Sequence, residues 1–294
     1  MTVFRFYKLH NNVFSIKMSN NTLIITSHSR WFDLGLRELW EYRDLLWFHV
    51  WREVRGKYRQ MALGPLWIIL QPIMHMIVFS FLFGRVAKLS SDGIPYVLMV
   101  YSAMVPWTFF SNACSAAVGS LVTQMGVISK VYFPRLIIPL SSILGGLIDF
   151  VLSFLVFLVI MLAMGRFPGW QIVFLPLYLL LAVACALALG LWTASLTVQF
   201  RDLRLVVQYG MQIAMYLTPV AYSSGEIARK FPDWMWLYQL NPMYWVIEGF
   251  RWCLFNTGTP PHWYMLLPVL LTLLAAGTGA IVFRRTERSI VDLL

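Results

Sequence analysis

Six long apolar stretches dominate the pattern of hydrophobic and polar positions along this chain. The first runs from Pro65 to Phe83 without an Asp, Glu, Lys or Arg, which is about the length needed to cross a hydrocarbon layer of roughly 30 Å. The other five are residues 94–119, 137–163, 173–198, 203–222 and 263–283. The pattern predicts an all-α, polytopic membrane protein with six transmembrane helices.

An amphipathic stretch precedes the first apolar stretch. Its apolar residues recur at spacings of three and four, and they are Leu36, Leu39, Trp40, Leu46, Trp47, Val50 and Val54. Its charged residues fall mostly on the opposite side, and they are Arg37, Glu38, Glu41, Asp44, Arg52, Glu53 and Arg55. This spacing predicts a helix that lies along the lipid surface. We therefore divide the chain into a polar N-terminal extension (1–30), an amphipathic cytoplasmic interface-helix region (31–62) and a transmembrane domain (63–290).

The connection between the fifth and sixth spans, residues 223–262, is rich in aromatic residues. Asn241-Pro242 interrupts it, and this pair predicts an N-cap followed by proline at the first helical position. We expect two short amphipathic pieces in or near the outer membrane interface. Glu248 and Arg251 are three residues apart and share one helix face, so they either line a polar passage or gate, or form a solvated surface pair. Asp149, within the third span, should face protein or water rather than lipid.

Composition and charge support a membrane protein and give it an orientation. The chain is 59% hydrophobic and 12% charged, with a net charge of +10. Of its Lys and Arg residues, 17 lie on the side that we predict to be cytoplasmic and six on the other, which places both termini in the cytoplasm. No cleavable signal is apparent in residues 1–30, in agreement with this orientation. Because the basic excess lies beside the spans, we attribute it to anionic membrane lipid and expect no nucleic-acid partner.

Catalytic chemistry finds little support in the sequence. The phosphate-binding pattern G-x-x-x-x-G-K-[ST] is absent, as are G-x-S-x-G and H-E-x-x-H. The three cysteines, Cys114, Cys185 and Cys253, are too dispersed for a metal site. We therefore expect no catalytic residue, metal or cofactor in this chain. Aromatic side chains, at 16%, suit either a path for a sugar polymer or ordinary lipid-facing packing; those on the second and fifth spans include Tyr101, Trp107, Phe110, Tyr209 and Tyr216.

Four motifs in order carry a resemblance to a known family. They are Tyr58-Arg59-Gln60-x-x-Leu63-Gly64-Pro65-Leu66-Trp67-x-x-x-Gln71-Pro72, Lys130-Val131-Tyr132-Phe133-Pro134-Arg135, Phe200-Arg201-Asp202 and Leu240-Asn241-Pro242-Met243. Over about residues 31–290 the chain resembles the ABC-2 type permeases of polysaccharide exporters, and above all those of O-antigen export. Capsule and teichoic acid exporters are near relatives.

The resemblance implies partners and functional residues. Members are homodimers in the bacterial inner membrane that export a lipid-linked polysaccharide through a channel at the subunit interface, and two copies of a separate ATPase subunit bind ATP and Mg. The interface helix (36–58) and a coupling helix (126–135) would contact the ATPase through Arg52, Arg55, Lys130, Tyr132, Phe133 and Arg135. Pieces around 234–255 would form an outer gate that includes Trp245, Glu248 and Arg251.

Two other function classes stay open at this point. A membrane enzyme acting on polyprenyl-linked sugars would have only Asp149, Glu248 and Arg251 as plausible acid/base or phosphate-binding residues, and these are scattered along the sequence. A proton-coupled secondary transporter predicts inverted repeats with matching broken spans, which we do not find in the sequence.

Overall fold

The structure is a computed structural model that describes residues 6–9, 13–18, 21–26, 36–59, 66–88, 91, 93–124, 126, 133–197 and 199–292. It separates into two compact units, residues 1–36 and 37–294. Lys130 and Tyr132, two of the expected coupling residues, lie outside the described residues.

The N-terminal unit contains a small antiparallel sheet. Its strands are β1 (Phe6–Leu9), β2 (Val13–Met18) and β3 (Asn21–Thr26), in the order β1-β2-β3. Phe6 pairs with Ile16, and Val13 pairs with Thr26. Alternation of apolar and polar residues with β-branched side chains favours strands here. This corrects the all-α expectation for the N-terminal segment, which was interpreted only as a polar extension.

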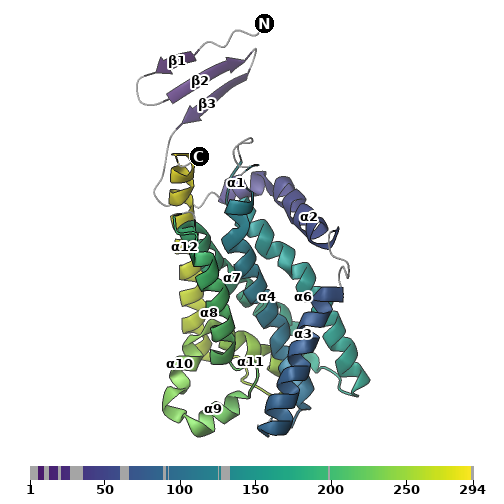
Figure 1. The fold of residues 1–294 in the computed structure, drawn as a ribbon. Helices are drawn as coiled ribbons and strands as arrows, with labels where there is room; N and C mark the ends of the chain where they lie inside the picture. The colour runs from purple at the N-terminus through teal and green to yellow at the C-terminus, as the bar shows by residue number, and fades with distance from the viewer. Residues whose placement is uncertain are drawn as a thin grey trace. The chain divides into compact units, whose positions relative to one another are not determined.

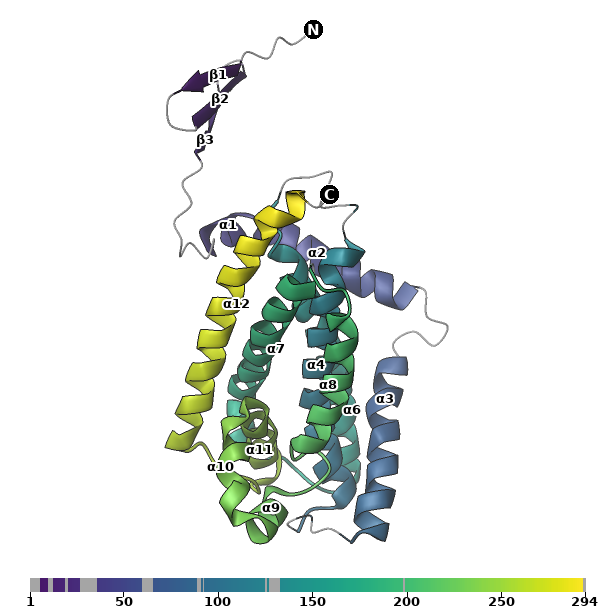
Figure 2. The ribbon, with the colours of Figure 1, turned by 60° about the vertical axis from the view of Figure 1, so that its left-hand side comes forward.

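The second unit is built from helices, and five of those described are long and apolar enough to cross a membrane. The spans are Ile69–Val86, Tyr96–Leu121, Ile137–Ala163, Trp170–Thr197 and Trp263–Thr286. They belong to α3 (Leu66–Phe79) with the π-helical η1 (Ser80–Val86), α4 (Tyr96–Thr123), α6 (Ile137–Ala163), η2 (Trp170–Phe174) with α7 (Leu175–Thr197), and η4 (Trp263–Met265) with α12 (Leu266–Asp292). Figures 1 and 2 show these long helices side by side.

The fifth expected span, residues 203–222, is shorter than predicted and is not among these five. Its helix, α8 (Leu203–Leu217), has 15 residues and is therefore about 22 Å long. Thr218 ends it in an extended conformation, so the apolar residues that follow leave the helix axis. In Figure 2, α8 lies along α4. Only Val207 and Met211 of α8 are buried, which leaves most of its surface exposed in the single chain.

Helix α4 forms the centre of the helical unit. It packs against α3, α6, α7, α8 and α11 (Pro242–Phe255), and its residues 98–107 are buried throughout. Close approach depends on small residues: a Cβ added at Gly190 of α7 would lie 3.0 Å from the Cβ of Ala117 of α4. A larger side chain at either position would force these two helices apart.

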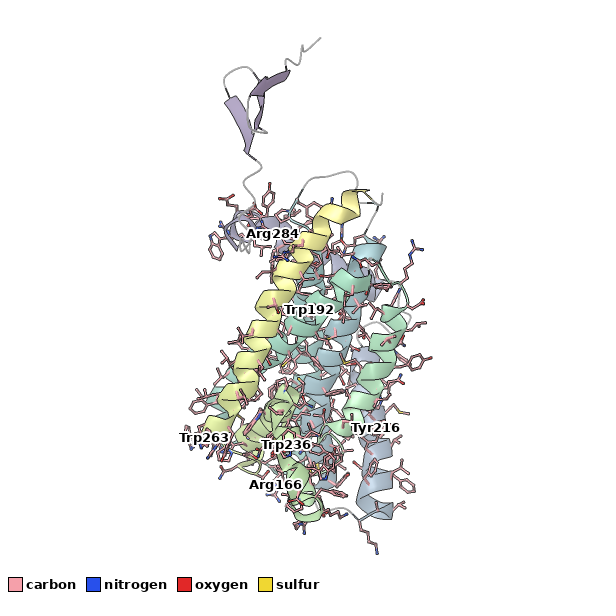
Figure 3. The ribbon with its side chains drawn as sticks, turned by 90° about the vertical axis from the view of Figure 1, so that its left-hand side faces the viewer. Arg166, Trp192, Tyr216, Trp236, Trp263 and Arg284 are labelled. Carbon is pink, nitrogen blue, oxygen red and sulfur yellow. The ribbon has the colours of Figure 1, made fainter. Side chains whose placement is uncertain are left out.

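The outer connection forms short helices, as expected. They are α9 (Ser224–Lys230), η3 (Pro232–Trp234), α10 (Met235–Leu240) and α11. The predicted cap is confirmed, because Asn241 Oδ1 accepts a hydrogen bond from the amide of Met243 at 3.0 Å and Pro242 begins α11. Helix α11 is almost wholly buried among its neighbours. Figure 3 places Trp236, Trp263 and Arg166 at this end of the unit and Arg284 at the other.

The interface region forms α1 (Leu36–Glu41) and α2 (Arg43–Arg59), as the amphipathic pattern predicts. Val50 and Val54 are buried, in agreement with the pattern. Trp40 and Trp47 belong to the same apolar side of the pattern, but both are exposed. The helix turns its smaller aliphatic residues inward, and the indoles remain on its flank, where an amphipathic ring suits a membrane interface.

Candidate coupling and gating sites

Helix α2 is fixed to α6 by polar contacts on both sides of a glycine. Near the start of α6, the hydroxyl of Ser142 donates a hydrogen bond to Glu53 Oε1 at 2.8 Å. One turn later, Val54 faces Gly145, and a Cβ added there would lie 3.8 Å from Val54 Cγ2. Because Ser142, Gly145 and Asp149 lie at i, i+3 and i+7, they share one face of α6.

Asp149 is the last of these contacts, and two residues of α2 bind it. Lys57 forms an ion pair with Asp149 Oδ2, and the hydroxyl of Tyr58 donates a hydrogen bond to Oδ1. Burial and the neighbouring carboxylate raise the pKa of Tyr58, so it remains a neutral donor. The expectation that Asp149 faces protein rather than lipid is therefore confirmed. Its ion pair makes it an anchor for α2.

The same helix also contacts the residues that flank the expected coupling segment. Arg52 Nη2 donates to Gln124 Oε1 at 2.6 Å, and Gln124 caps the end of α4. The ring of His49 lies 5.5 Å from that of Phe133, which is buried. Residues 127–132 between these contacts lie outside the described residues. Helix α2 is thus attached on both sides of this segment.

Burial shapes the electrostatics of this contact. It lowers the pKa of His49, and the guanidinium of Arg52, whose Nη2 lies 3.0 Å from His49 Nδ1, lowers it further. Burial raises the pKa of Glu53, although the Ser142 hydroxyl, Arg52 and Lys57 oppose this shift. A neutral His49 accepts a hydrogen bond from Arg52, whereas a protonated ring would repel it.

The predicted coupling residues divide into two groups within the described part of the chain. Arg52 and Phe133 point into the contact between α2 and its neighbours. Arg55 points outward and lies over the ring of Trp51, with 5.6 Å from its Cζ to the ring centroid. Arg135 is half-buried beside the start of α6.

Four of the expected channel or gate residues lie inside the core of the single chain. Tyr101, Trp107, Phe110 and Trp245 are all buried. Each of them makes a ring contact, such as the 5.6 Å contact between the Tyr101 and Phe157 centroids, and Trp245 also donates to the carbonyl of Gln239 at 2.7 Å. Their positions show packing rather than a channel wall within one chain.

Tyr209 and Tyr216 have the opposite environment, because both are exposed on α8. They are seven residues apart and therefore lie on one side of the helix, away from the buried Val207 and Met211. Tyr216 contacts Phe79 of α3, with 6.3 Å between the ring centroids.

Glu248 and Arg251 form a fully buried ion pair on α11, with side chains 1% and 4% exposed and 2.9 Å between Oε1 and Nη1. Glu248 also accepts hydrogen bonds from the hydroxyl of Ser224 at 2.9 Å and from the amide of Thr259 at 3.2 Å. Arg251 donates to the carbonyl of Val220 at 3.3 Å. The surface-pair interpretation is therefore wrong: the pair joins α11 to the segments before and after it.

Sequence reasoning missed most partners in these two sites. They include His49, Lys57, Tyr58, Gln124, Ser142, Ser224 and Thr259. Lys57 offered the clearest signal, since a cation just before an apolar span and a carboxylate inside another span would each be costly without a partner. Their sequence separation of 92 residues concealed the pairing.

Comparisons with known proteins agree on one family. A profile described as ABC-2 type transporter matches residues 44–255. An O-antigen export system permease protein from Myxococcus xanthus is 31% identical over 254 residues, which cover 86% of this chain and 96% of that protein. A protein of the same name from Klebsiella pneumoniae is 26% identical and covers 85% and 95% of the two chains. A polysialic acid transport protein from Escherichia coli is 22% identical over 67% of this chain and 76% of its own length.

Proposed function

Because the chain belongs to the ABC-2 type transporter family, we propose that it is the permease subunit of an ABC transporter that exports a lipid-linked, O-antigen-like polysaccharide. The family and the apolar helices make it a multi-pass membrane protein with a transport rather than a catalytic role. The relatives that match along nearly their whole length are named as O-antigen export permeases, and this supports the substrate class.

The energy source in this proposal is a separate ATPase subunit, two copies of which bind ATP and Mg. One observation carries the assignment of its docking side: α2 is attached to α6 and to both flanks of the segment 127–132. Movement of that segment would therefore displace α2 and α6 together. A ligand in one subunit can shift a two-state equilibrium in another only through such differential contacts.

A homodimer accounts for the exposed face of α8. The face carries two tyrosines and lies opposite Val207 and Met211, which are the buried residues of the helix. In a dimer this face would line the path of the polymer, with Tyr209 and Tyr216 stacking on sugar rings. Helix α8 is then the fifth of six spans, and the apolar residues after Thr218 complete its crossing.

The outer end would act as the gate of this channel. Glu248 and Arg251 hold α11 against the residues before and after it. Trp245 anchors the start of the same helix through its bond to Gln239. Because α11 is packed as one piece, opening would move the outer segment as a unit rather than rotate single side chains.

The charge bias supports an orientation with both termini in the cytoplasm, and the proposal places the protein in the inner membrane. Arg284 near the end of α12 forms an ion pair with Glu38 of α1, so both ends of the membrane unit lie on one side. The basic residues on this side face anionic lipid headgroups.

A capsule or teichoic acid exporter is the second candidate, and the match to a polysialic acid transport protein favours capsule among these. The membrane-enzyme alternative is weakened by the structure. Asp149 is paired with Lys57, and Glu248 with Arg251, on separate sets of elements, so these residues do not form a common acid/base site.

Reconstitution tests the proposal directly. The permease should co-purify with an ATPase chain, and liposomes containing both should translocate a lipid-linked polysaccharide when ATP is supplied. Replacing Tyr132 or Arg135 with Glu should abolish translocation while the permease remains folded, because a carboxylate would disturb the docking side. Transport or modification of substrate by the permease alone would refute the proposal, and normal export by both variants would refute the coupling assignment.

A further inference from the structure

The chain that follows α8, residues 218–222, is buried at the outer end of the helical unit, and we call it the outer turn. Val220 and Ala221 are 0% and 4% exposed. Because the helix has ended, the carbonyls of these residues have no partner within a helix and need other donors. Side chains supply them: Arg251 Nη2 donates to the carbonyl of Val220 at 3.3 Å, and the hydroxyl of Tyr96 donates to the carbonyl of Ala221.

Several contacts attach the outer turn to α11. Arg251 lies on this helix, and Asn241, the N-cap of the helix, donates to the hydroxyl of Thr218 at 3.0 Å. Just beyond the outer turn, the hydroxyl of Ser224 donates to Glu248 of α11 at 2.9 Å. The outer turn is therefore bound to α11 and its cap at its start, at its middle and beyond its end, so the two should move together.

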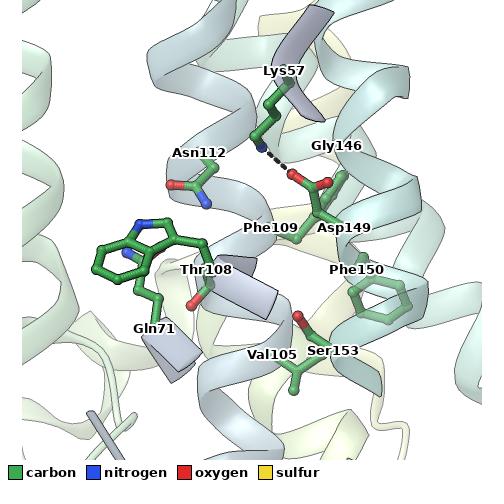
Figure 4. A pocket seen from close by; sticks show the side chains of 11 residues that line it. Lys57, Gln71, Val105, Thr108, Phe109, Asn112, Gly146, Asp149, Phe150 and Ser153 are labelled. Atoms are coloured by element: carbon green, nitrogen blue, oxygen red, sulfur yellow. Dashed lines mark hydrogen bonds and ion pairs between the residues drawn. The ribbon is translucent and has the colours of Figure 1, made fainter. Parts of the chain in front are cut away.

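Tyr96 belongs instead to α4, of which it is the first residue. Further inward on this helix, Phe109 packs on Gly146 of α6, beside the Lys57–Asp149 ion pair (Figure 4). A Cβ added at Gly146 would lie 3.4 Å from Phe109 Cε2. Helix α4 therefore extends from the contact between α2 and α6 to the outer turn. A displacement of α2 and α6 can reach the outer turn along this one helix.

The ring of Tyr96 lies against the π-helical end of the first span. A Cβ added at Gly84 of η1 would lie 3.0 Å from the Cγ of Tyr96 and 3.1 Å from its Cδ1, which is tighter than an ordinary contact. The ring can therefore occupy this position because residue 84 has no side chain. Short π-helical segments are frequent at functional sites. Here the segment fixes the ring from which the hydroxyl reaches Ala221.

The two attachments of the outer turn differ in strength. The attachment to α11 includes a donor from a charged guanidinium, whereas the hydrogen bond to α4 comes from the neutral hydroxyl of Tyr96. Hydrogen bonds that involve a charged group are about twice as strong as those between neutral groups. A force between α4 and α11 should therefore break the Tyr96 bond first and leave the outer turn attached to α11.

We propose that Tyr96 is a positioning residue of the outer gate. Its hydroxyl holds the outer turn on α4 in the closed transporter, and release of this bond lets the outer end of α8 move away from α4 together with α11. The inference rests on the proposed function and deepens it, because it names the contact that breaks when the outer end opens. Gly84 acts through Tyr96 by giving the ring its place.

Thiol labelling of the permease–ATPase complex in lipid nanodiscs tests this role. Val220→Cys places a small buried thiol in the outer turn, and a maleimide that does not enter lipid should modify it slowly without ATP and faster during ATP turnover. Tyr96→Phe should raise the labelling rate without ATP about fivefold, because loss of one hydrogen bond shifts the closed-to-open equilibrium by this factor. Tyr222→Phe is the matched control, since its hydroxyl donates to the carbonyl of Tyr216 at 2.9 Å, away from α4.

The native cysteines show whether the effect is local. Cys114 on α4 and Cys185 on α7 are buried, and their labelling should stay slow in the Tyr96→Phe variant. A general loss of packing would expose them together with the introduced thiol. A parallel increase at these cysteines, or an equal increase in the Tyr222→Phe control, would overturn the role of Tyr96.

Gly84→Ala provides a second way to disturb the same bond. The added methyl group would displace the ring of Tyr96, so labelling of the introduced thiol should rise, although less than in Tyr96→Phe. In the double variant the alanine should add nothing, because the hydroxyl on which it acts is already absent. An equal increase with and without the hydroxyl would overturn the action of Gly84 through Tyr96.

ATP-driven export is measured on proteoliposomes that contain the same complexes. Export by the otherwise unaltered Val220→Cys complex, with labelling that Tyr96→Phe leaves unchanged, overturns only the role of Tyr96. Export without any ATP-dependent labelling of the introduced thiol also overturns it, because the outer turn then does not move. Absence of export by the complex without substitutions refutes the proposed function, whatever the labelling shows.

Discussion

The two ion pairs at opposite ends of the helical unit differ in burial and connectivity. The inner pair, Lys57 and Asp149, joins α2 to α6, and its side chains are 40% and 13% exposed. The outer pair, Glu248 and Arg251, lies within one helix, and its side chains are 1% and 4% exposed. The inner pair has one additional partner, Tyr58, while the outer pair binds groups before and after α11.

This difference indicates which contact can move. A partly exposed pair contributes about 0–1 kcal/mol to stability, because water solvates the separated charges. Removing one partner of a buried pair costs about 3–5 kcal/mol, because the other charge is left without compensation. The inner contact can therefore separate and re-form more easily than the outer contact, which maintains α11 and its flanking segments as one rigid piece.

The largest expected effect comes from breaking the outer pair. Glu248→Gln should lower the free energy of unfolding by about 3–5 kcal/mol, because it leaves the Arg251 guanidinium buried without a counter-charge. The thermal unfolding of the detergent-solubilised protein measures this. Glu226→Gln is the control on the same outer segment, since its i, i+3 pair with Arg229 is exposed on the arginine side; we expect a loss of about 0–1 kcal/mol there. Equal losses in both variants would contradict the comparison.

A bulky residue at Gly145 should separate α2 from α6. Gly145→Leu introduces atoms where Val54 now packs, and we expect a stability loss of about 1–3 kcal/mol together with a loss of export. Gly145→Ala should be tolerated, because its Cβ would lie 3.8 Å from Val54 Cγ2, an ordinary contact distance. A disulfide between cysteines placed at Glu53 and Ser142 reports on the contact and should form in the alanine variant only. Unimpaired export by the leucine variant would show that this contact is not needed.

Breaking the inner pair should affect export more than stability. Asp149→Asn should change the free energy of unfolding by about 0.5–1 kcal/mol, because the partly exposed Lys57 stays solvated without its partner. Lys57→Met should cost more, because the mostly buried Asp149 keeps only Tyr58 as a partner. ATP-driven export should fall, since α2 then loses its attachment to the middle of α6. The double variant Lys57→Asp with Asp149→Lys restores the pair in reverse and should recover export. If export does not recover, the charges act by some means other than pairing.

The smallest effect should be a pH dependence centred on His49. Because the pKa of His49 is lowered in the folded protein, the contribution of neutral His49 to the free energy of unfolding is complete above about pH 6.5. This contribution is lost as the pH falls through the folded-state pKa of His49. The raised pKa of Glu53 makes the free energy of unfolding rise on acidification, because the folded protein binds a proton at Glu53 at a higher pH than the unfolded chain does. His49→Gln keeps a neutral partner for Arg52 and removes only the first contribution. Between about pH 7.5 and 5.5, stability should therefore fall more in the unaltered protein than in the variant; parallel curves would exclude a role for His49.

The sequence alone determined the class of this protein, because membrane insertion depends on local properties. The uncharged run from Pro65 to Phe83, the amphipathic period of the interface helix and the Asn241-Pro242 cap can each be evaluated within a few turns of chain. Each of the four motifs that indicated the family is likewise a short run of neighbouring residues. Burial of Val50 and Val54 and the cap at Asn241 followed as predicted.

Only the tertiary structure decided which polar groups meet and which aromatic residues are exposed. Lys57 and Asp149 are 92 residues apart, and nothing in their neighbourhoods encodes the pairing. Tyr101 and Tyr209 look alike in sequence, yet the first is in the core beside Phe157 and the second is on the surface of α8. The physical reason is the same in both cases: periodicity fixes the faces of a helix, but the neighbour of each face depends on how all the helices pack together.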